Sequence, residues 1–115
     1  MHLTRIDHVS LNVHDRRLSI SWYEQVLGMR ALHAHAPADE PIFLGAQGRR
    51  LGLFADRAPG LRHVALATDH AALGHLAVRL DRMGIRYQAE RHRDSDSIYF
   101  ADPDGTMLEV MVPTT

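Results

Sequence analysis

Cysteine and lysine are both missing from this 115-residue chain. The absence of cysteine excludes disulfide bridges, thiolate catalysis, and zinc or iron–sulfur sites built on cysteine. All 13 basic residues are arginine, which excludes Schiff-base chemistry on a lysine amine. Histidine is abundant by contrast, with nine residues, and this favours a metal site.

Long apolar runs and a strong net charge are lacking too. No run of apolar residues is long enough to span a bilayer, and the first five residues have no signal-peptide pattern. The net charge of −1 argues against nucleic acid as a partner. We therefore expect a cytoplasmic protein that binds a small molecule and neither nucleic acid nor a membrane. The apolar fraction of 45% suits a single packed domain over residues 1–115.

A strand–turn–strand pattern near the end of the chain is the clearest local signal. The turn is Asp102-Pro103-Asp104-Gly105, in which Pro103 presets φ and Gly105 accepts a positive φ. After the turn, Leu108, Val110 and Val112 alternate with Met107, Glu109 and Met111. This alternation predicts two faces, with Glu109 between two methionines on one of them.

The other elements are predicted from periodicity and stop signals. A helix should run from the N-cap Asp15 to Leu27, before Gly28, and a second over 71–83, before Gly84. The predicted buried face of the first helix holds Leu18, Trp22, Tyr23, Val26 and Leu27. The predicted strands are 5–13, 29–34, 42–45, 50–54, 61–68, 85–90 and the terminal hairpin, with a charged loop at 91–95.

The chain repeats itself. Residues 7–11 (DHVSL) match residues 62–66 (RHVAL), and LGMR at 27–30 matches MGIR at 83–86. Each half reads βαβββ, which gives module one at 1–55 and module two at 61–115. We therefore predict an α+β fold in which two modules, each too small to bury its sheet alone, pack together.

Three polar side chains in apolar strands are candidate metal ligands. A buried carboxylate such as Glu109 is costly unless it is paired or bound to a metal. His8 and His63 occupy equivalent positions of the two modules. We predict that these three residues meet.

The chain resembles the vicinal oxygen chelate superfamily, which includes glyoxalase I, extradiol dioxygenases, fosfomycin-resistance transferases, methylmalonyl-CoA epimerase and bleomycin-resistance proteins. The residues that carry the resemblance are Ile6-Asp7-His8-Val9, Trp22-Tyr23 with Leu27-Gly28, Leu61-Arg62-His63-Val64-Ala65, and Tyr99 to Gly105 with Leu108-Glu109. The resemblance implies a glyoxalase/dioxygenase-like fold, in which two paired βαβββ modules form a curved mixed sheet around a cleft.

The resemblance also implies a ligand set. His8, His63 and Glu109 match three of the family's four metal positions, and the remaining position falls near Gly52, which has no side chain to ligate. Two histidines and one carboxylate leave open positions on a divalent ion, here Fe, Mn, Ni or Zn.

Further site residues follow from the family comparison and from strand alternation. Tyr99, ten residues before Glu109, and His92 in the charged loop are the predicted catalytic residues. The predicted substrate-binding residues are Ser10, Asn12, Arg50 and Ser97.

Several activities fit this pattern. The leading interpretation is a metal-dependent, extradiol-dioxygenase-like enzyme whose substrate chelates the metal through vicinal oxygens. A glyoxalase-type lyase or isomerase and a fosfomycin-type thiol transferase are alternatives. A further alternative is a metal-free protein that sequesters an antibiotic or aromatic ligand, as bleomycin-resistance proteins do. We expect a homodimer, with the site formed within one chain or across a swapped pair.

Overall fold

The computed structural model describes residues 3–46, 48–92 and 95–113, and the chain divides into two compact units. One unit, Asp7–Arg62, is called here the His8 unit. The other comprises the chain from His63 onward with the N-terminal segment that ends at Ile6, and is called the His63 unit. No helix among the described residues is long and apolar enough to cross a membrane.

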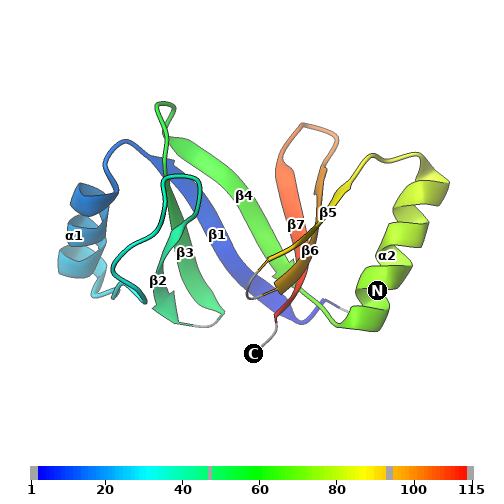
Figure 1. The fold of residues 1–115 in the computed structure, drawn as a ribbon, viewed down its shortest axis with the longest axis horizontal. Helices are drawn as coiled ribbons and strands as arrows, with labels where there is room; N and C mark the ends of the chain where they lie inside the picture. Colours follow the sequence, from blue (N-terminus) through cyan, green and yellow to red (C-terminus); the bar gives the residue numbers. More distant parts are fainter. Residues whose placement is uncertain (1–2, 47, 93–94, 114–115) are drawn as a thin grey trace. The chain divides into compact units, whose positions relative to one another are not determined.

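The His8 unit contains a three-stranded mixed sheet and one helix (Figure 1). Its elements are β1 (Arg5–Val13, which starts in the other unit), α1 (Arg16–Leu27), β2 (Ile42–Ala46) and β3 (Arg49–Ala55). The strand order is β2-β3-β1, with β2 antiparallel and β1 parallel to β3. The register sets His8 opposite Arg50 and Ser10 opposite Gly52, so these residues share one face of the sheet.

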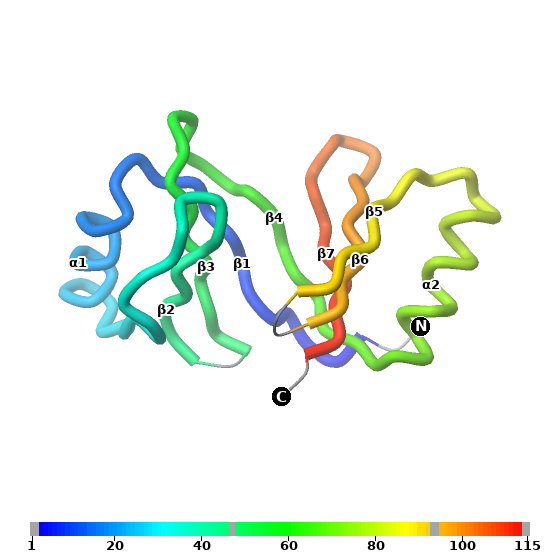
Figure 2. The backbone as a smooth tube through the Cα atoms, in the orientation of Figure 1, coloured from blue at the N-terminus to red at the C-terminus, as the bar shows by residue number. Residues whose placement is uncertain are grey.

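The His63 unit contains a four-stranded mixed sheet with a helix against one face. Its elements are β4 (Gly60–Ala67, which starts in the His8 unit), α2 (His70–Met83), β5 (Gln88–Arg91), β6 (Ser95–Ala101) and β7 (Met107–Pro113), and the strand order is β4-β7-β6-β5. Gly84 caps the end of α2. From there the backbone returns through β5 to the β6–β7 hairpin (Figure 2). The predicted α+β class and the βαβββ order are confirmed here.

The core of the His63 unit lies between α2 and the hairpin. Leu76 and Leu80 from α2 pack against Ile98 and Val110. Because side chains alternate along a strand, the opposite face of β6 and β7 is left for Ser97, Tyr99 and Glu109. The two faces predicted for the last strand are confirmed.

The predicted caps and turn are confirmed as well. Asp15 accepts a hydrogen bond from the Leu18 backbone N–H at 3.2 Å, and the helix ends at Gly28 in the left-handed region. In the last hairpin Gly105 has φ 86°, and the Asp102 carboxylate accepts the N–H groups of Asp104 and Thr106. The turn between β2 and β3 includes Gln47, which lies outside the described residues, as do Arg93 and Asp94 of the charged loop.

The predicted burial of α1 is wrong. No residue of this helix is buried; the exposed fractions are 71% for Leu18, 53% for Trp22, 57% for Val26 and 61% for Leu27. The fifth predicted residue, Tyr23, is half-buried and packs edge-on against Trp22. Helical periodicity identifies an apolar stripe, but it does not say whether another element covers the stripe.

The strand predicted over 29–34 is also wrong. Only an isolated bridge joins Ala31 to Leu44. The Phe43 backbone N–H donates to the imidazole Nε2 of His33 at 3.1 Å. The side chain thus takes a donor that a continuing strand would have used, and regular pairing ends there.

Candidate functional site

The candidate metal ligands are the three residues predicted from the sequence, His8, His63 and Glu109, and all three are buried. His8 belongs to one unit, while His63 and Glu109 belong to the other.

In the His63 unit, the parallel pairing of β4 with β7 brings His63 and Glu109 together. Ala65 is the register partner of Glu109, and His63 lies one step further along the same face. The distance from His63 Nε2 to Glu109 Oε1 is 2.9 Å. Two ligands held at right angles, each about 2.1 Å from a divalent ion, lie about 3.0 Å apart. The pair therefore has a separation that suits two neighbouring ligands of one ion and equally a direct hydrogen bond.

Ser97 holds the other oxygen of the same carboxylate. Its Oγ donates to Glu109 Oε2 at 2.6 Å, and both side chains are buried. Ser95 Oγ lies 3.4 Å from Ser97 Oγ. A hydroxyl that bonds one carboxylate oxygen leaves the other directed at His63, so Ser97 orients Glu109.

The predicted catalytic residues Tyr99 and His92 contact each other. The Tyr99 hydroxyl lies 2.9 Å from His92 Nε2, and Glu90 Oε2 lies 3.5 Å from the same nitrogen. Tyr99 also packs edge-on against the His63 ring, with centroids 5.8 Å apart. Burial, and then the negative charge of Glu109, raise the pKa of Tyr99 above its usual value. The phenol thus stays protonated at neutral pH and can donate a hydrogen bond.

In the His8 unit, a buried carboxylate orients His8. Asp7, which is 1% exposed, accepts from His8 Nδ1 at 2.7 Å and from Arg50 Nη2 at 2.5 Å. Burial alone would raise the pKa of Asp7, but the bonds from His8 and Arg50 lower it below its usual value. An ionised carboxylate only accepts hydrogen bonds, so Nδ1 of His8 carries the proton.

Phe43 fixes the two side chains that bind Asp7. The Phe43 and His8 rings form a T-shaped contact with 5.0 Å between their centroids. The Arg50 guanidinium lies over the Phe43 ring, 4.2 Å from its centroid. Arg50 Nε is buried, and it has no hydrogen-bond partner among the described residues. A buried N–H without a partner is costly, and an ordered water or a ligand would satisfy it.

The remaining predicted substrate-binding residues lie along the same face of β1. Ser10 is fully buried. Asn12 is half-buried, and its side-chain oxygen Oδ1 accepts a hydrogen bond from Arg62 at 3.0 Å. Opposite Ser10, a Cβ at position 52 would lie 3.0 Å from Phe43 and 3.1 Å from Ser10 Oγ. Phe43 thus occupies the space in which a fourth ligand at position 52 would stand.

Sequence reasoning missed the roles of Asp7 and Phe43. A signal for Asp7 existed in the repeat, because the residue before His63 is an arginine whereas the residue before His8 is an aspartate. Of the two histidines, only His8 therefore has a carboxylate as its neighbour in the sequence. Phe43 had no such signal, because its contact with His8 depends on sheet register.

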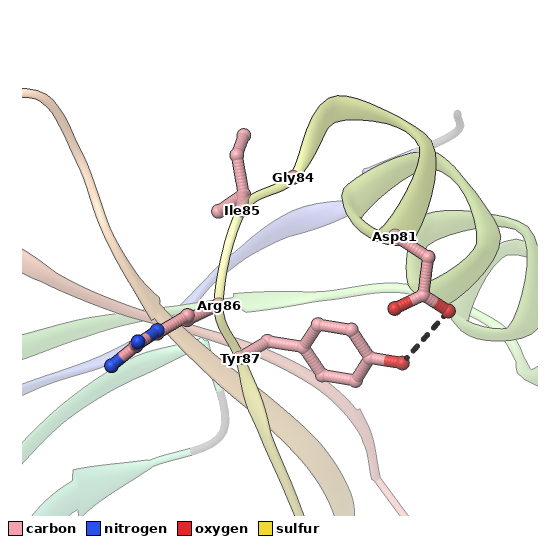
Figure 3. Close-up of a pocket in the computed structure, with 5 residues that line it drawn as sticks. All are labelled: Asp81, Gly84, Ile85, Arg86 and Tyr87. Atoms are coloured by element: carbon pink, nitrogen blue, oxygen red, sulfur yellow. Dashed lines mark hydrogen bonds between the residues drawn. The ribbon is translucent and has the colours of Figure 1, made fainter.

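A surface hollow in the His63 unit lies away from these residues. It has a volume of about 570 Å³ and is lined by Asp81, Gly84, Ile85, Arg86 and Tyr87 (Figure 3). The Tyr87 hydroxyl donates to Asp81 at 3.3 Å. The hollow includes none of the predicted site residues.

The chain was compared with models of known protein families. Residues 5–110 match the model of the Glyoxalase/Bleomycin resistance protein/Dioxygenase superfamily. The chain belongs to this superfamily. The resemblance inferred from the sequence is confirmed, and every candidate ligand lies inside the matched range.

Individual superfamily members differ in activity. A catechol-2,3-dioxygenase of Bacillus subtilis (strain 168) is 29% identical over 119 residues, covering 93% of this chain but 41% of that protein. The chain thus spans about two fifths of this relative's length. The metallothiol transferase FosB of Bacillus licheniformis is 28% identical over 115 residues, covering 91% of this chain and 73% of the transferase.

The solved structures agree on the fold. The crystal structure of methylmalonyl-CoA epimerase from Mycobacterium tuberculosis has a TM-score of 0.79 and 25% identity, covering 98% of this chain and 90% of the epimerase. The glyoxalase/dioxygenase-like fold predicted for this superfamily member is therefore confirmed.

Proposed function

We propose that this protein binds one divalent metal ion through His8, His63 and Glu109 and uses it to hold a small substrate by two neighbouring oxygens. The observation that carries the proposal is the buried pair of His63 and Glu109, whose facing atoms are 2.9 Å apart. His8 supports it from the other unit, because Asp7 engages Nδ1 and leaves Nε2 as the ligand atom.

The donor set fits a metal. Neutral imidazole and carboxylate suit Fe, Mn, Ni or Zn in the divalent state, and three protein ligands leave positions for a chelating substrate. Both ligands in the His63 unit are buried, and the bond from Ser97 orients the Glu109 carboxylate toward His63. When bound, the ion supplies a Lewis acid for an enolate, catecholate or alkoxide.

The protein's own groups then define the chemistry. Tyr99, kept protonated, would donate a hydrogen bond to a substrate oxygen, and His92 would orient the phenol through the 2.9 Å contact. Arg50 Nε would bind a second oxygen, and Ser10 and Asn12 would line the same face. A ring-cleaving, extradiol-dioxygenase-like reaction uses such a set, and the similarity to a catechol-2,3-dioxygenase supports it.

Thiol transfer is the second candidate. It is favoured by the similarity to the metallothiol transferase FosB. This chain covers 73% of the length of that transferase but only 41% of the length of the dioxygenase. Isomerisation of the glyoxalase type would need a fourth ligand, and Gly52 with Phe43 beside it supplies none. A metal-free sequestering protein remains the outcome if no metal binds.

We also propose a homodimer, in which the two half-sites come together within one chain or between copies. Mixing His8→Ala and His63→Ala copies under refolding conditions distinguishes these arrangements. Metal binding returns in the mixture only if two copies share a site. Sedimentation of the unmixed protein reports the oligomeric state.

The decisive experiment is metal analysis of anaerobically purified protein. The wild type should hold close to one ion per chain, His8→Ala and Glu109→Ala should hold little, and His75→Ala, an exposed residue of α2, should match the wild type. Iron would direct the assays to catechol cleavage, and nickel, zinc or manganese to thiol transfer and isomerisation. No metal in the wild type after reconstitution with each ion would overturn the proposal.

A further inference from the structure

We infer that Asp7 and Arg50 are positioning residues that fix the tautomer and orientation of His8, so that Nε2, rather than Nδ1, is the nitrogen of the neutral ring that could bind a metal. That this nitrogen binds a metal ion rests on the proposed function. The tautomer itself is a property of the metal-free protein and can be tested alone.

The first step is the bonding around His8 Nδ1. The Asp7 carboxylate lies 2.7 Å from this nitrogen and is 1% exposed. Because an ionised carboxylate has no proton to donate, Nδ1 must donate, and a neutral imidazole then carries a bare Nε2. Metal-bound histidines commonly have their second nitrogen held by a carboxylate in this way.

Arg50 holds the Asp7 carboxylate in place. Arg50 donates to the same oxygen, Oδ2, that accepts from His8. A buried carboxylate with one partner would be costly and free to rotate, whereas two charge-assisted bonds on one oxygen fix its direction. The sheet register contributes as well, because Arg50 lies directly opposite His8 in the parallel β1–β3 pair.

The third step is the packing around this chain of bonds. The Phe43 ring forms a T-shaped contact with His8 and lies face-on under Arg50, so both donors are held against one ring. This geometry limits rotation of the imidazole, which would otherwise turn Nδ1 away from Asp7 and put the ring carbon Cδ2 in its place. Restraint of the ring lowers the conformational entropy that metal binding would lose.

The fourth step is the contrast with His63. Its Nε2 faces Glu109 directly, and the residue that precedes it is Arg62 rather than a carboxylate. The two histidines match in the repeat but have different surroundings. The Asp7–Arg50 arrangement is therefore specific to the first module.

The test reads the tautomer in metal-free protein. Long-range proton–nitrogen correlation spectra of ¹⁵N-histidine-labelled protein, recorded where imidazole is neutral, should show His8 protonated at Nδ1 in the wild type. Asp7→Ala should shift the population toward Nε2–H. Asp7→Asn keeps the size of the side chain and should fold, but its amide can donate to Nδ1, so this variant should also shift the population toward Nε2–H. It guards against misfolding in the alanine variant. Asp56→Asn, in the same unit, is the matched control.

The second readout is affinity for the metal alone, with manganese and zinc titrated by competition against a chelator. Loss of a carboxylate partner typically weakens metal binding about 10–100-fold, which is the expectation for Asp7→Ala. Arg50→Met, which keeps the side-chain stem on Phe43, should show a smaller loss. A wild-type His8 protonated at Nε2, or an Asp7→Ala variant with unchanged tautomer, would overturn the inference. Absence of metal binding in a wild type with the expected tautomer would instead overturn the proposed function.

Discussion

His63 and Glu109 face each other across β4 and β7 with 2.9 Å between Nε2 and Oε1. An imidazole nitrogen and a carboxylate oxygen are both common metal ligands. In the metal-free protein these two atoms are within hydrogen-bond distance of each other. An ion held by both atoms would replace the proton between them. The same arrangement would therefore form a hydrogen bond in the metal-free protein and two metal–ligand bonds in the metal-bound protein.

Replacing Glu109 by glutamine should separate these two uses. The amide keeps the size of the carboxylate, so the variant should fold, but it removes the charge that holds a divalent ion. Wild-type protein at a metal concentration of about 100 times Kd should gain about 2.7 kcal/mol in the free energy of unfolding. Glu109→Gln should gain far less, as measured by chemical unfolding with and without metal. Equal gains would exclude Glu109 as a ligand, and Glu24→Gln, an exposed change in α1, should behave as wild type.

Ser97→Ala should weaken metal binding while it leaves the ligand set complete. Ser97 Oγ donates to Glu109 Oε2 at 2.6 Å, and loss of such an orienting bond typically costs about 10–100-fold in affinity. Competition titration with zinc measures the change, with Ser21→Ala in α1 as the control. If metal affinity is unchanged and substrate KM rises instead, Ser97 binds substrate, as first predicted from the sequence.

Tyr99 should resist ionisation. Its pKa is raised by burial and by the charge of Glu109. A group whose pKa is raised on folding stabilises the fold below its unfolded pKa of about 10 and loses that contribution as pH rises through the folded value. Chelator-treated wild type should lose stability above about pH 10 more steeply than Tyr99→Phe.

The phenolate absorbance checks the same point. Subtracting the Tyr99→Phe titration from the wild-type titration gives the curve of Tyr99. Its midpoint should lie above the ordinary tyrosine value. A midpoint at or below that value would contradict the burial and the charge relationship described for Tyr99.

Arg16 should stabilise the segment before β2. Its guanidinium donates to the backbone carbonyls of Ala36, Pro37 and Glu40. Hydrogen bonds to a charged group contribute about 1.5–3 kcal/mol, so Arg16→Ala should lower the free energy of unfolding by about that amount. Urea unfolding measures the change, and Arg17→Ala, its exposed neighbour, should change it little. A loss as small as that of Arg17→Ala would show that the three carbonyls are equally well solvated by water.

Prediction from the sequence succeeded where one local rule was sufficient. Asp15, Gly28 and Gly105 were interpreted from capping and turn chemistry, which depends on a few neighbouring residues. The alternation around Glu109 placed it on the correct face because a strand has a period of two. The rules failed at α1, whose apolar stripe is exposed, and at 29–34, where the His33 side chain replaces backbone pairing.

The sequence by itself determined the repeat, the order of helices and strands in the second half of the chain, the superfamily and the three candidate ligands, because each depends on residue type and spacing along the chain. In the first half it predicted one strand too many, at 29–34. Tertiary structure decided which atoms meet. The parallel pairing of β4 with β7 set His63 against Glu109, and that of β1 with β3 set Arg50 beside Asp7 and His8. These contacts join residues far apart in the chain, and their register is fixed by packing of whole strands, which no local pattern encodes.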